Sequence, residues 1–89
     1  MSVAGAFTMQ LTYDPRYNIA YLRLHEKTPG TAVETIRVSD ELSVDIAPDG
    51  TVFGIELLNA NEQLGAEDQG ALVVVNEAVG LRREVSLVE

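Results

Sequence analysis

Apolar and polar residues alternate in five short segments over the first two-thirds of the chain. Alternation with a period of two residues is typical of a β-strand with one buried face. The pattern predicts strands at 7–13, 19–25, 32–38, 42–47 and 51–58. Because the connections between them are short, antiparallel neighbours are favoured, and the simplest topology is a five-stranded antiparallel β-meander.

Turn-forming residues separate these segments. Pro15 fixes φ for a turn, and Asp14 and Asn18 on either side of it can bond the local backbone. Thr28-Pro29-Gly30-Thr31 predicts the next reversal. Asp49-Gly50 between two strand-like runs is a strong hairpin signal, because glycine adopts positive φ without strain.

The alternation also assigns the strand residues to faces. Gly54 lies opposite the apolar face of its strand and leaves room for close packing there. A sheet with one apolar face needs a hydrophobic core on that face. We expect that core to contain Met9, Leu11, Leu22, Leu24, Val44, Ile46, Ile55 and Leu57.

The remainder of the chain changes character at Asn59. With Glu62 three residues later, Asn59 has capping-box spacing, which predicts a short helix that ends near Gly65 and packs near the apolar face. Residues 71–79 fit a helix by the spacing of their apolar positions and a strand by their β-branched residues, so both remain open. Alternation over 81–88 favours a strand. The predicted class is α+β, mainly antiparallel sheet.

Several of these segments together form a recognisable order of motifs. Leu11-Thr12-Tyr13-Asp14-Pro15, Asn18–Leu24, Val44-Asp45-Ile46 with Asp49-Gly50, and Val52–Ala60 follow one another at compatible spacing. Over residues 9–64 this order resembles the prokaryotic family named domain of unknown function 2283. The resemblance implies the turns and the sheet and carries no activity. The chain departs from the family pattern at Asn18 and Asn59, where aspartate is usual, so no carboxylate role is implied at those positions.

A length of 89 residues indicates a single domain, 1–89, made of a family-like core, 7–64, and a C-terminal extension, 66–89. Apolar residues make up 46 % of the chain, which indicates a folded protein. A chain this short buries only about 60–65 % of its unfolded surface, so self-association is favoured. The absence of cysteine excludes disulfides, thiolate catalysis and Cys-ligated metal sites.

Six Lys and Arg residues against fourteen Asp and Glu residues give a formal charge of −8. Nucleic acids and anionic membranes attract basic clusters, so direct contact with either is not expected. The first residues lack the basic and apolar regions of a signal peptide, and the longest apolar run, Ala71–Val75, is far shorter than a membrane helix. We therefore expect a cytoplasmic protein.

Three residues are candidates for chemistry. Asp45 and Glu56 lie on the polar faces of the two strands joined by Asp49-Gly50, where the carboxylates could share a cation or raise each other's pKa. His25, the only histidine, has the pKa range of a general base. Ordinary solvated side chains are the simpler interpretation of all three. No metal-site or cofactor motif is present, and we expect no cofactor.

Two classes of function follow from these patterns. The first is a non-enzymatic module that forms a homodimer or binds an unidentified protein partner. The second is a minimal metal-assisted, hydrolase-like enzyme that uses Asp45 and Glu56. We expect the homodimer to involve the C-terminal segment, whose apolar residues over 71–88 are too many for a solvated tail. Packing of 66–89 on its own sheet is the alternative.

Overall fold

The computed structural model describes residues 8–26, 28–65 and 70–88. In chain order the elements are β1 (Gln10–Asp14), β2 (Ile19–Arg23), β3 (Glu34–Ser39), β4 (Leu42–Ile46), β5 (Val52–Leu58), α1 (Ala60–Gln63), β6 (Ala71–Asn76) and β7 (Leu81–Ser86). All five strands predicted for the first two-thirds of the chain are present, within a few residues of the predicted bounds. The predicted start of the first strand, at residue 7, lies outside the described residues.

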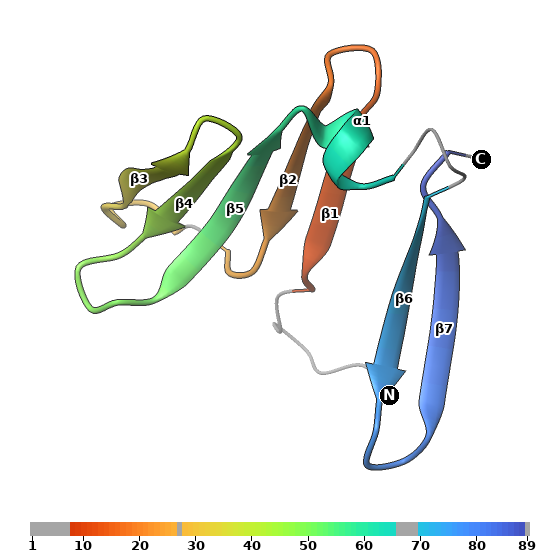
Figure 1. Cartoon of the computed structure of the whole chain (residues 1–89). Helices are drawn as coiled ribbons and strands as arrows, with labels where there is room; N and C mark the ends of the chain where they lie inside the picture. The colour runs from red at the N-terminus through yellow and green to blue at the C-terminus, as the bar shows by residue number, and fades with distance from the viewer. Residues whose placement is uncertain (1–7, 27, 66–69, 89) are drawn as a thin grey trace.

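The strands form a five-stranded antiparallel sheet in the order β1-β2-β5-β4-β3 and a separate two-stranded sheet, β6-β7 (Figure 1). The predicted class, a mainly antiparallel sheet with a short helix after the fifth strand, is confirmed. The strand order of a simple meander is wrong, because β2 pairs with β5 and not with β3. The connection from Leu24 to Val33 is long enough to carry the chain past the place of β5 to the far edge. The longest strand, β5, therefore lies at the centre of the sheet, between β2 and β4.

The register places the expected apolar residues on one face, in rows that run across the strands. One row joins Tyr13, Ala20, Leu57 and Leu42. The next row joins Leu11, Leu22, Ile55, Val44 and Ile36. Met9, Leu24 and Ile46 continue the alternation beyond that second row. We call these residues together the apolar face, and the opposite side the polar face.

The short helix α1 covers only one end of the apolar face. Ala20 in β2 and Ala60 in α1 are 1 % and 0 % exposed, and the helix contacts β2. The Tyr13 hydroxyl donates to the Asn61 side chain, which joins the first row of the apolar face to the helix. Leu64 and Gly65 then end the helix, with Gly65 at φ 64°, as the sequence predicts. The small core of the chain lies beneath this helix.

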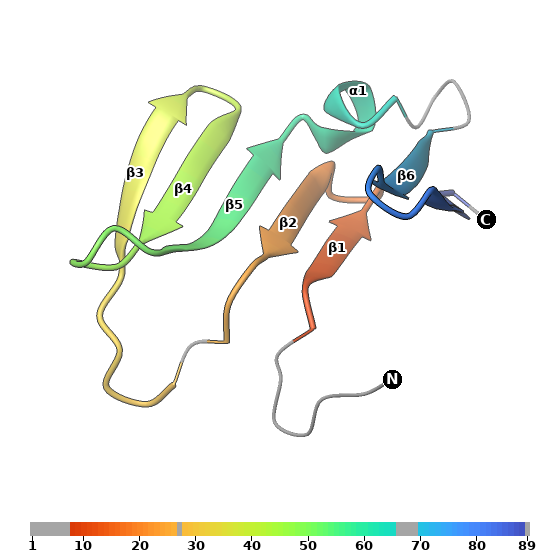
Figure 2. The same ribbon diagram turned by 90° about the horizontal axis from the view of Figure 1, so that it is seen from below.

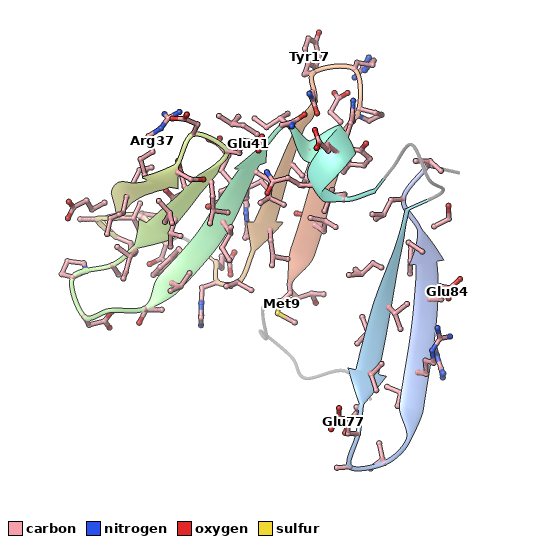
Figure 3. All side chains as sticks on the ribbon, viewed as in Figure 1. Met9, Tyr17, Arg37, Glu41, Glu77 and Glu84 are labelled. Carbon is pink, nitrogen blue, oxygen red and sulfur yellow. The ribbon has the colours of Figure 1, made fainter. Side chains whose placement is uncertain are left out.

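No second layer covers the rest of the apolar face among the described residues. Side chains project from both sides of a single sheet (Figure 3). Leu11, Leu22, Val44 and Ile55 are half-buried, and no large side chain is completely buried among the described residues. The expected core residues therefore lie on the predicted face of the sheet, but their side chains are only partly buried. Met9 is the clear exception: it is 66 % exposed, because it precedes β1 at the end of the sheet farthest from α1.

The C-terminal segment is a β-hairpin, which decides between the two structures left open for residues 71–79. Strand β6 pairs with β7 from Ala71 opposite Ser86 to Asn76 opposite Leu81. Val73, Val74 and Val75 favour the strand because β-branched side chains lose χ1 freedom in a helix. The turn is closed by Gly80 at φ 69° and by a bond from the Ala78 amide to Asn76 Oδ1 at 3.1 Å.

This hairpin stands apart from the sheet, beyond β1, in two perpendicular views (Figures 1 and 2). Every residue of both its strands is exposed. The accessible surface of the chain is 6837 Å², compared with about 5,100 Å² for a compact protein of this mass. The exposed apolar side chains of the hairpin and of the apolar face contribute to that excess.

Candidate functional site

The three candidate residues lie on or next to the polar face. Asp45 is opposite Gly54, and Glu56 is opposite Ser43 on one side and Tyr21 on the other. Asp45 and Glu56 therefore share a face but occupy diagonal positions, not directly opposed ones. His25 follows the end of β2 and is exposed.

Tyr21 connects three strands on this face. Its ring lies across Gly54, and its hydroxyl donates to Asp45 Oδ2 at 2.7 Å. The other carboxylate oxygen of Asp45 accepts a bond of the same length from the Thr35 hydroxyl in β3. We call this set, Tyr21, Thr35, Asp45 and Gly54, the tyrosine bridge. It links β2, β3, β4 and β5, and it confirms that Gly54 makes room for close packing.

A register shift shapes the neighbourhood of the bridge. Asp45 pairs with Gly54 and Ile46 with Val52, so Phe53 has no partner in the β4–β5 ladder. Such a bulge turns the extra side chain towards the face of its neighbour. Phe53 contacts the His25 ring, with 5.7 Å between ring centroids, and His25 Nδ1 lies 3.0 Å from the carbonyl oxygen of Val52.

These side chains surround a shallow hollow of about 240 Å³, which is lined by Tyr21, Arg23, His25, Val33, Asp45 and Phe53. The Arg23 guanidinium lies 5.9 Å from the centre of the Tyr21 ring, in the range of a cation–π contact. Both oxygens of Asp45 already accept hydrogen bonds, so a cation at Asp45 competes with Tyr21 and Thr35 for the carboxylate. Among the described residues, no three carboxylate or histidine side chains gather in a metal-binding group.

The environment of Tyr21 makes its hydroxyl a weaker acid than that of a free tyrosine. Burial, followed by the hydrogen bond to Asp45 and the charge of that carboxylate, raises the pKa of Tyr21 from 10.0 to about 12. The neutral phenol is the form that the fold stabilises. A raised pKa gives stability that is complete below the unfolded value of about 10. This stability is lost as the pH rises through the folded value of about 12.

We therefore expect one tyrosine of the native protein to ionise near pH 12, measured by the ultraviolet absorbance of the phenolate. The Tyr21→Phe variant should lack this late step and keep the remaining phenolate signal. Tyr17→Phe is the control, because Tyr17 is exposed and its loss should leave the late step unchanged. A late step that persists in Tyr21→Phe contradicts the assignment.

Gly54 is predicted to be coupled to Tyr21. A Cβ at position 54 overlaps the hydroxyl end of the Tyr21 ring, so Gly54→Ala has to displace the ring and break the bond to Asp45. We expect a loss of about 1–3 kcal/mol in the free energy of unfolding, measured by urea denaturation.

A double-mutant cycle separates this coupling from the effect of alanine itself. In a Tyr21→Ala background, Gly54→Ala should be neutral or stabilising by about 0.5–1 kcal/mol, because alanine loses less backbone entropy in a strand. An equal loss in both backgrounds contradicts the coupling.

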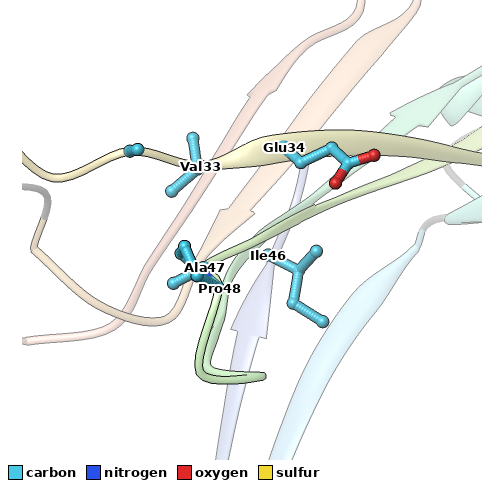
Figure 4. Close-up of a pocket in the computed structure, with 6 residues that line it drawn as sticks. Val33, Glu34, Ile46, Ala47 and Pro48 are labelled. Atoms are coloured by element: carbon cyan, nitrogen blue, oxygen red, sulfur yellow. The ribbon is translucent and has the colours of Figure 1, made fainter.

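A second hollow, of about 310 Å³, lies at the end of β3 and β4 (Figure 4). Ala32, Val33, Glu34, Ile46, Ala47 and Pro48 line it. Its walls are mostly apolar, and Glu34 is the only lining residue with a charged side chain. Ile46 and Glu34 belong to the same side of the sheet as Val44 and Ile36. The hollow is thus a depression at the border of the apolar face.

A second polar group, which we call the asparagine cluster, ties α1 to the sheet. It consists of Asn18, Asn59 and Asn61. Asn18 Oδ1 accepts a bond of 2.7 Å from the Asn61 amide, and Asn18 Nδ2 lies 3.3 Å from Asn59 Oδ1. Asn59 also donates to Glu41 Oε2 at 2.9 Å and to Glu62 Oε2 at 3.0 Å. The cluster therefore anchors the helix to the β1–β2 turn and to the β3–β4 turn.

The predicted capping role of Asn59 is wrong in its details. Asn59 does precede the helix, but at φ 54° and ψ 41° it makes no side-chain cap bond. The left-handed backbone turns its side chain away from the free helix amides, and Asn18 supplies the oxygen that the Asn61 amide needs. Both Asn18 and Asn59 have positive φ, a conformation that asparagine tolerates better than most residues.

Sequence reasoning identified Asp45 and Gly54 but missed their connection through Tyr21, and it missed Thr35 altogether. The available signal was the alternation itself, which places Tyr21 and Gly54 on the polar face, but the pairing of their strands is seen only in the structure. The asparagine cluster was also missed. Its signal was the presence of asparagine at two turns where positive φ is needed.

The described part of the chain holds one helix, α1, and it is far too short to cross a membrane. Comparison with curated proteins and with solved structures finds no match. A family model, described as "Protein of unknown function (DUF2283)", matches residues 10–61, which extend from β1 into α1. The resemblance noted in the sequence is confirmed over the sheet and the start of the helix, and the hairpin lies beyond the match. The chain belongs to the DUF2283 family of proteins of unknown function.

Proposed function

We propose that this protein is a non-catalytic, self-associating module that forms a homodimer through its C-terminal hairpin. The main support for this proposal is the exposure of apolar side chains in β6 and β7. Leu72, Val73, Val74, Val75, Leu81 and Val85 are between 39 % and 55 % exposed. Monomeric soluble proteins rarely expose so many apolar side chains on one small element, and exposed apolar patches mark interaction sites.

The hairpin also needs support, and the other described residues give it little. An isolated two-stranded hairpin is at best marginally stable in water, and three or more strands or a packed face are needed for independent stability. Both outer edges of β6 and β7 carry unpaired backbone groups, which invite pairing. A partner that covers the hairpin stabilises the folded state by mass action.

A second copy is the partner that the exposed apolar surfaces favour, because one chain supplies both the hairpin and the uncovered apolar face. The formal charge of −8 makes like-charge repulsion between copies the main opposing term, and salt screens that repulsion. Association driven by apolar burial should therefore tighten as ionic strength rises. A basic partner would behave in the opposite way, because salt weakens attraction between unlike charges.

The test is a dilution series of the purified chain, followed by light scattering at low and at high salt. We expect a dimer whose dissociation constant falls as salt is added. A single-chain mass at all concentrations contradicts the proposal, and so does a dimer that salt dissociates.

The enzyme hypothesis, in which Asp45 and Glu56 bind a metal, makes a separate prediction. Calorimetric titration of magnesium, calcium, manganese and zinc into the protein should then give specific binding that Glu56→Gln abolishes. The module proposal predicts no such binding, because Asp45 is engaged with Tyr21 and Thr35.

A further inference from the structure

The two faces of the hairpin differ in character. On one face lie Leu72, Val74, Leu81 and Val85, interrupted by Asn76 and Arg83. On the other face, Val73 and Val75 of β6 lie opposite Glu84 and Arg82 of β7. Arg82 and Glu84 form an exposed ion pair at 3.2 Å. Both strands contribute apolar side chains to the first face, so it is the face suited to an apolar contact.

The five-stranded sheet presents the complementary surface. Helix α1 covers the row that contains Ala20, and the row that contains Leu22, Val44 and Ile55 stays half-buried, with Ile36 44 % exposed at its end. The hollow beside Ile46 and Pro48 lies at the border of this uncovered strip. An apolar side chain that crosses the strip can seat there.

We propose that the hairpin of one copy lies across the uncovered strip of the apolar face of the other copy, and that the exchange is reciprocal. The inference rests on the proposed self-association and specifies which surfaces meet. The Leu72–Val74–Val85 face of the hairpin contacts the Leu22–Ile55–Val44 row of the partner copy, and the Arg82–Glu84 face remains in water.

The dimensions agree with this arrangement. Six residues of strand extend about 20 Å, and two strands are about 10 Å wide. Five strands of a sheet span about 24 Å, and the uncovered strip is about two side-chain rows deep, roughly 10–14 Å. A hairpin laid across the strands therefore covers the strip, in an orientation that packed sheets adopt.

The buried area lies near the lower limit for a specific interface. Flat geometry gives on the order of 800 Å² for two reciprocal contacts with both surfaces counted. Because side chains project from both surfaces, the accessible area buried is larger than this flat value and approaches the roughly 1,200–2,000 Å² of a typical specific interface. One exchange satisfies both unpartnered apolar surfaces of the chain, whereas pairing of two hairpins leaves the sheet uncovered.

Single cysteines test the contact, because the natural chain has none. An Ile55→Cys chain and a Val74→Cys chain are mixed, allowed to exchange subunits and treated with a short crosslinker that joins two thiols. We expect a crosslinked dimer in the mixture and little in either variant alone. Val73→Cys is the matched control, because Val73 neighbours Val74 on the opposite face of the same strand. Its mixture with Ile55→Cys should crosslink much less.

Other crosslinking patterns would overturn specific parts of the proposal. Crosslinking of Ile55→Cys to itself, with none to Val74→Cys, shows sheet-to-sheet packing and overturns the exchange while the dimer stands. Equal crosslinking by Val73→Cys and Val74→Cys overturns the assigned face. A chain that carries both Ile55→Cys and Val74→Cys, diluted into excess unmodified protein, reports packing within one chain. A link inside that chain overturns both the exchange and the hairpin-mediated dimer.

Discussion

Val74→Asp is expected to weaken dimerisation by at least about 100-fold, or about 2.7 kcal/mol. Val74 is 51 % exposed in the single chain, so the substitution should change the stability of the monomer by no more than about 0.5 kcal/mol. In the dimer, the same position lies in an apolar contact, where a carboxylate loses its hydration, and Arg83 directly opposite in β7 offsets only part of that loss. The dissociation constant, measured by sedimentation velocity over a dilution series, reports the difference.

Val73→Asp is the matched control for that experiment. The two valines are adjacent in β6 and point to opposite faces of the hairpin. Because Val73 shares its face with the exposed Arg82–Glu84 pair, its substitution should weaken dimerisation by less than about threefold. Equal effects at the two positions contradict the assigned face, and the absence of any effect at Val74 contradicts hairpin-mediated dimerisation.

The second large effect is expected at Asn18. We expect Asn18→Ala to lower the free energy of unfolding by about 2–3 kcal/mol. Alanine at φ 59° is strained by about 1–2 kcal/mol, and loss of the oxygen that accepts from the Asn61 amide costs about 1 kcal/mol more. Urea denaturation at a fixed chain concentration measures the change, since self-association makes stability depend on concentration.

Asn18→Gly separates the two causes. Glycine adopts positive φ without strain but has no side chain, so this variant should lose only about 1 kcal/mol. Equal losses for alanine and glycine contradict the backbone contribution. If neither variant loses stability, the asparagine cluster does not anchor α1.

The local features of the fold were predictable because short-range chemistry determines them. The turn at Asp14–Asn18 uses the residues that the sequence indicates: Asp14 Oδ1 accepts from the Arg16 amide at 3.0 Å. The ion pair with Arg16 lowers the pKa of Asp14. Asp49-Gly50 likewise closes its hairpin with Gly50 at φ 92°. Period-two alternation assigned the faces of the five strands, apart from the register shifts at Phe53 in β5 and between Arg37 and Ser39 in β3.

The pairing of distant strands was not predictable in the same way. Whether β2 meets β3 or β5 depends on contacts between segments that are far apart in sequence, and both pairings satisfy the local alternation. The bulge at Phe53 has the same origin, because one residue of slip between β4 and β5 carries no signal in composition. Tyr21 reaches Asp45 only because β5, with Gly54, lies between their strands. The sequence therefore identified the candidate carboxylate, Asp45, but could not identify its hydrogen-bond partner, Tyr21.

In the proposed homodimer, the C-terminal hairpin joins two copies of this chain. Sedimentation equilibrium of the unmodified protein, at tens of micromolar in moderate salt, tests it most directly. We expect a mass of twice 9.6 kDa that Val74→Asp reduces to the mass of one chain under the same conditions. A mass of one chain for the unmodified protein contradicts it.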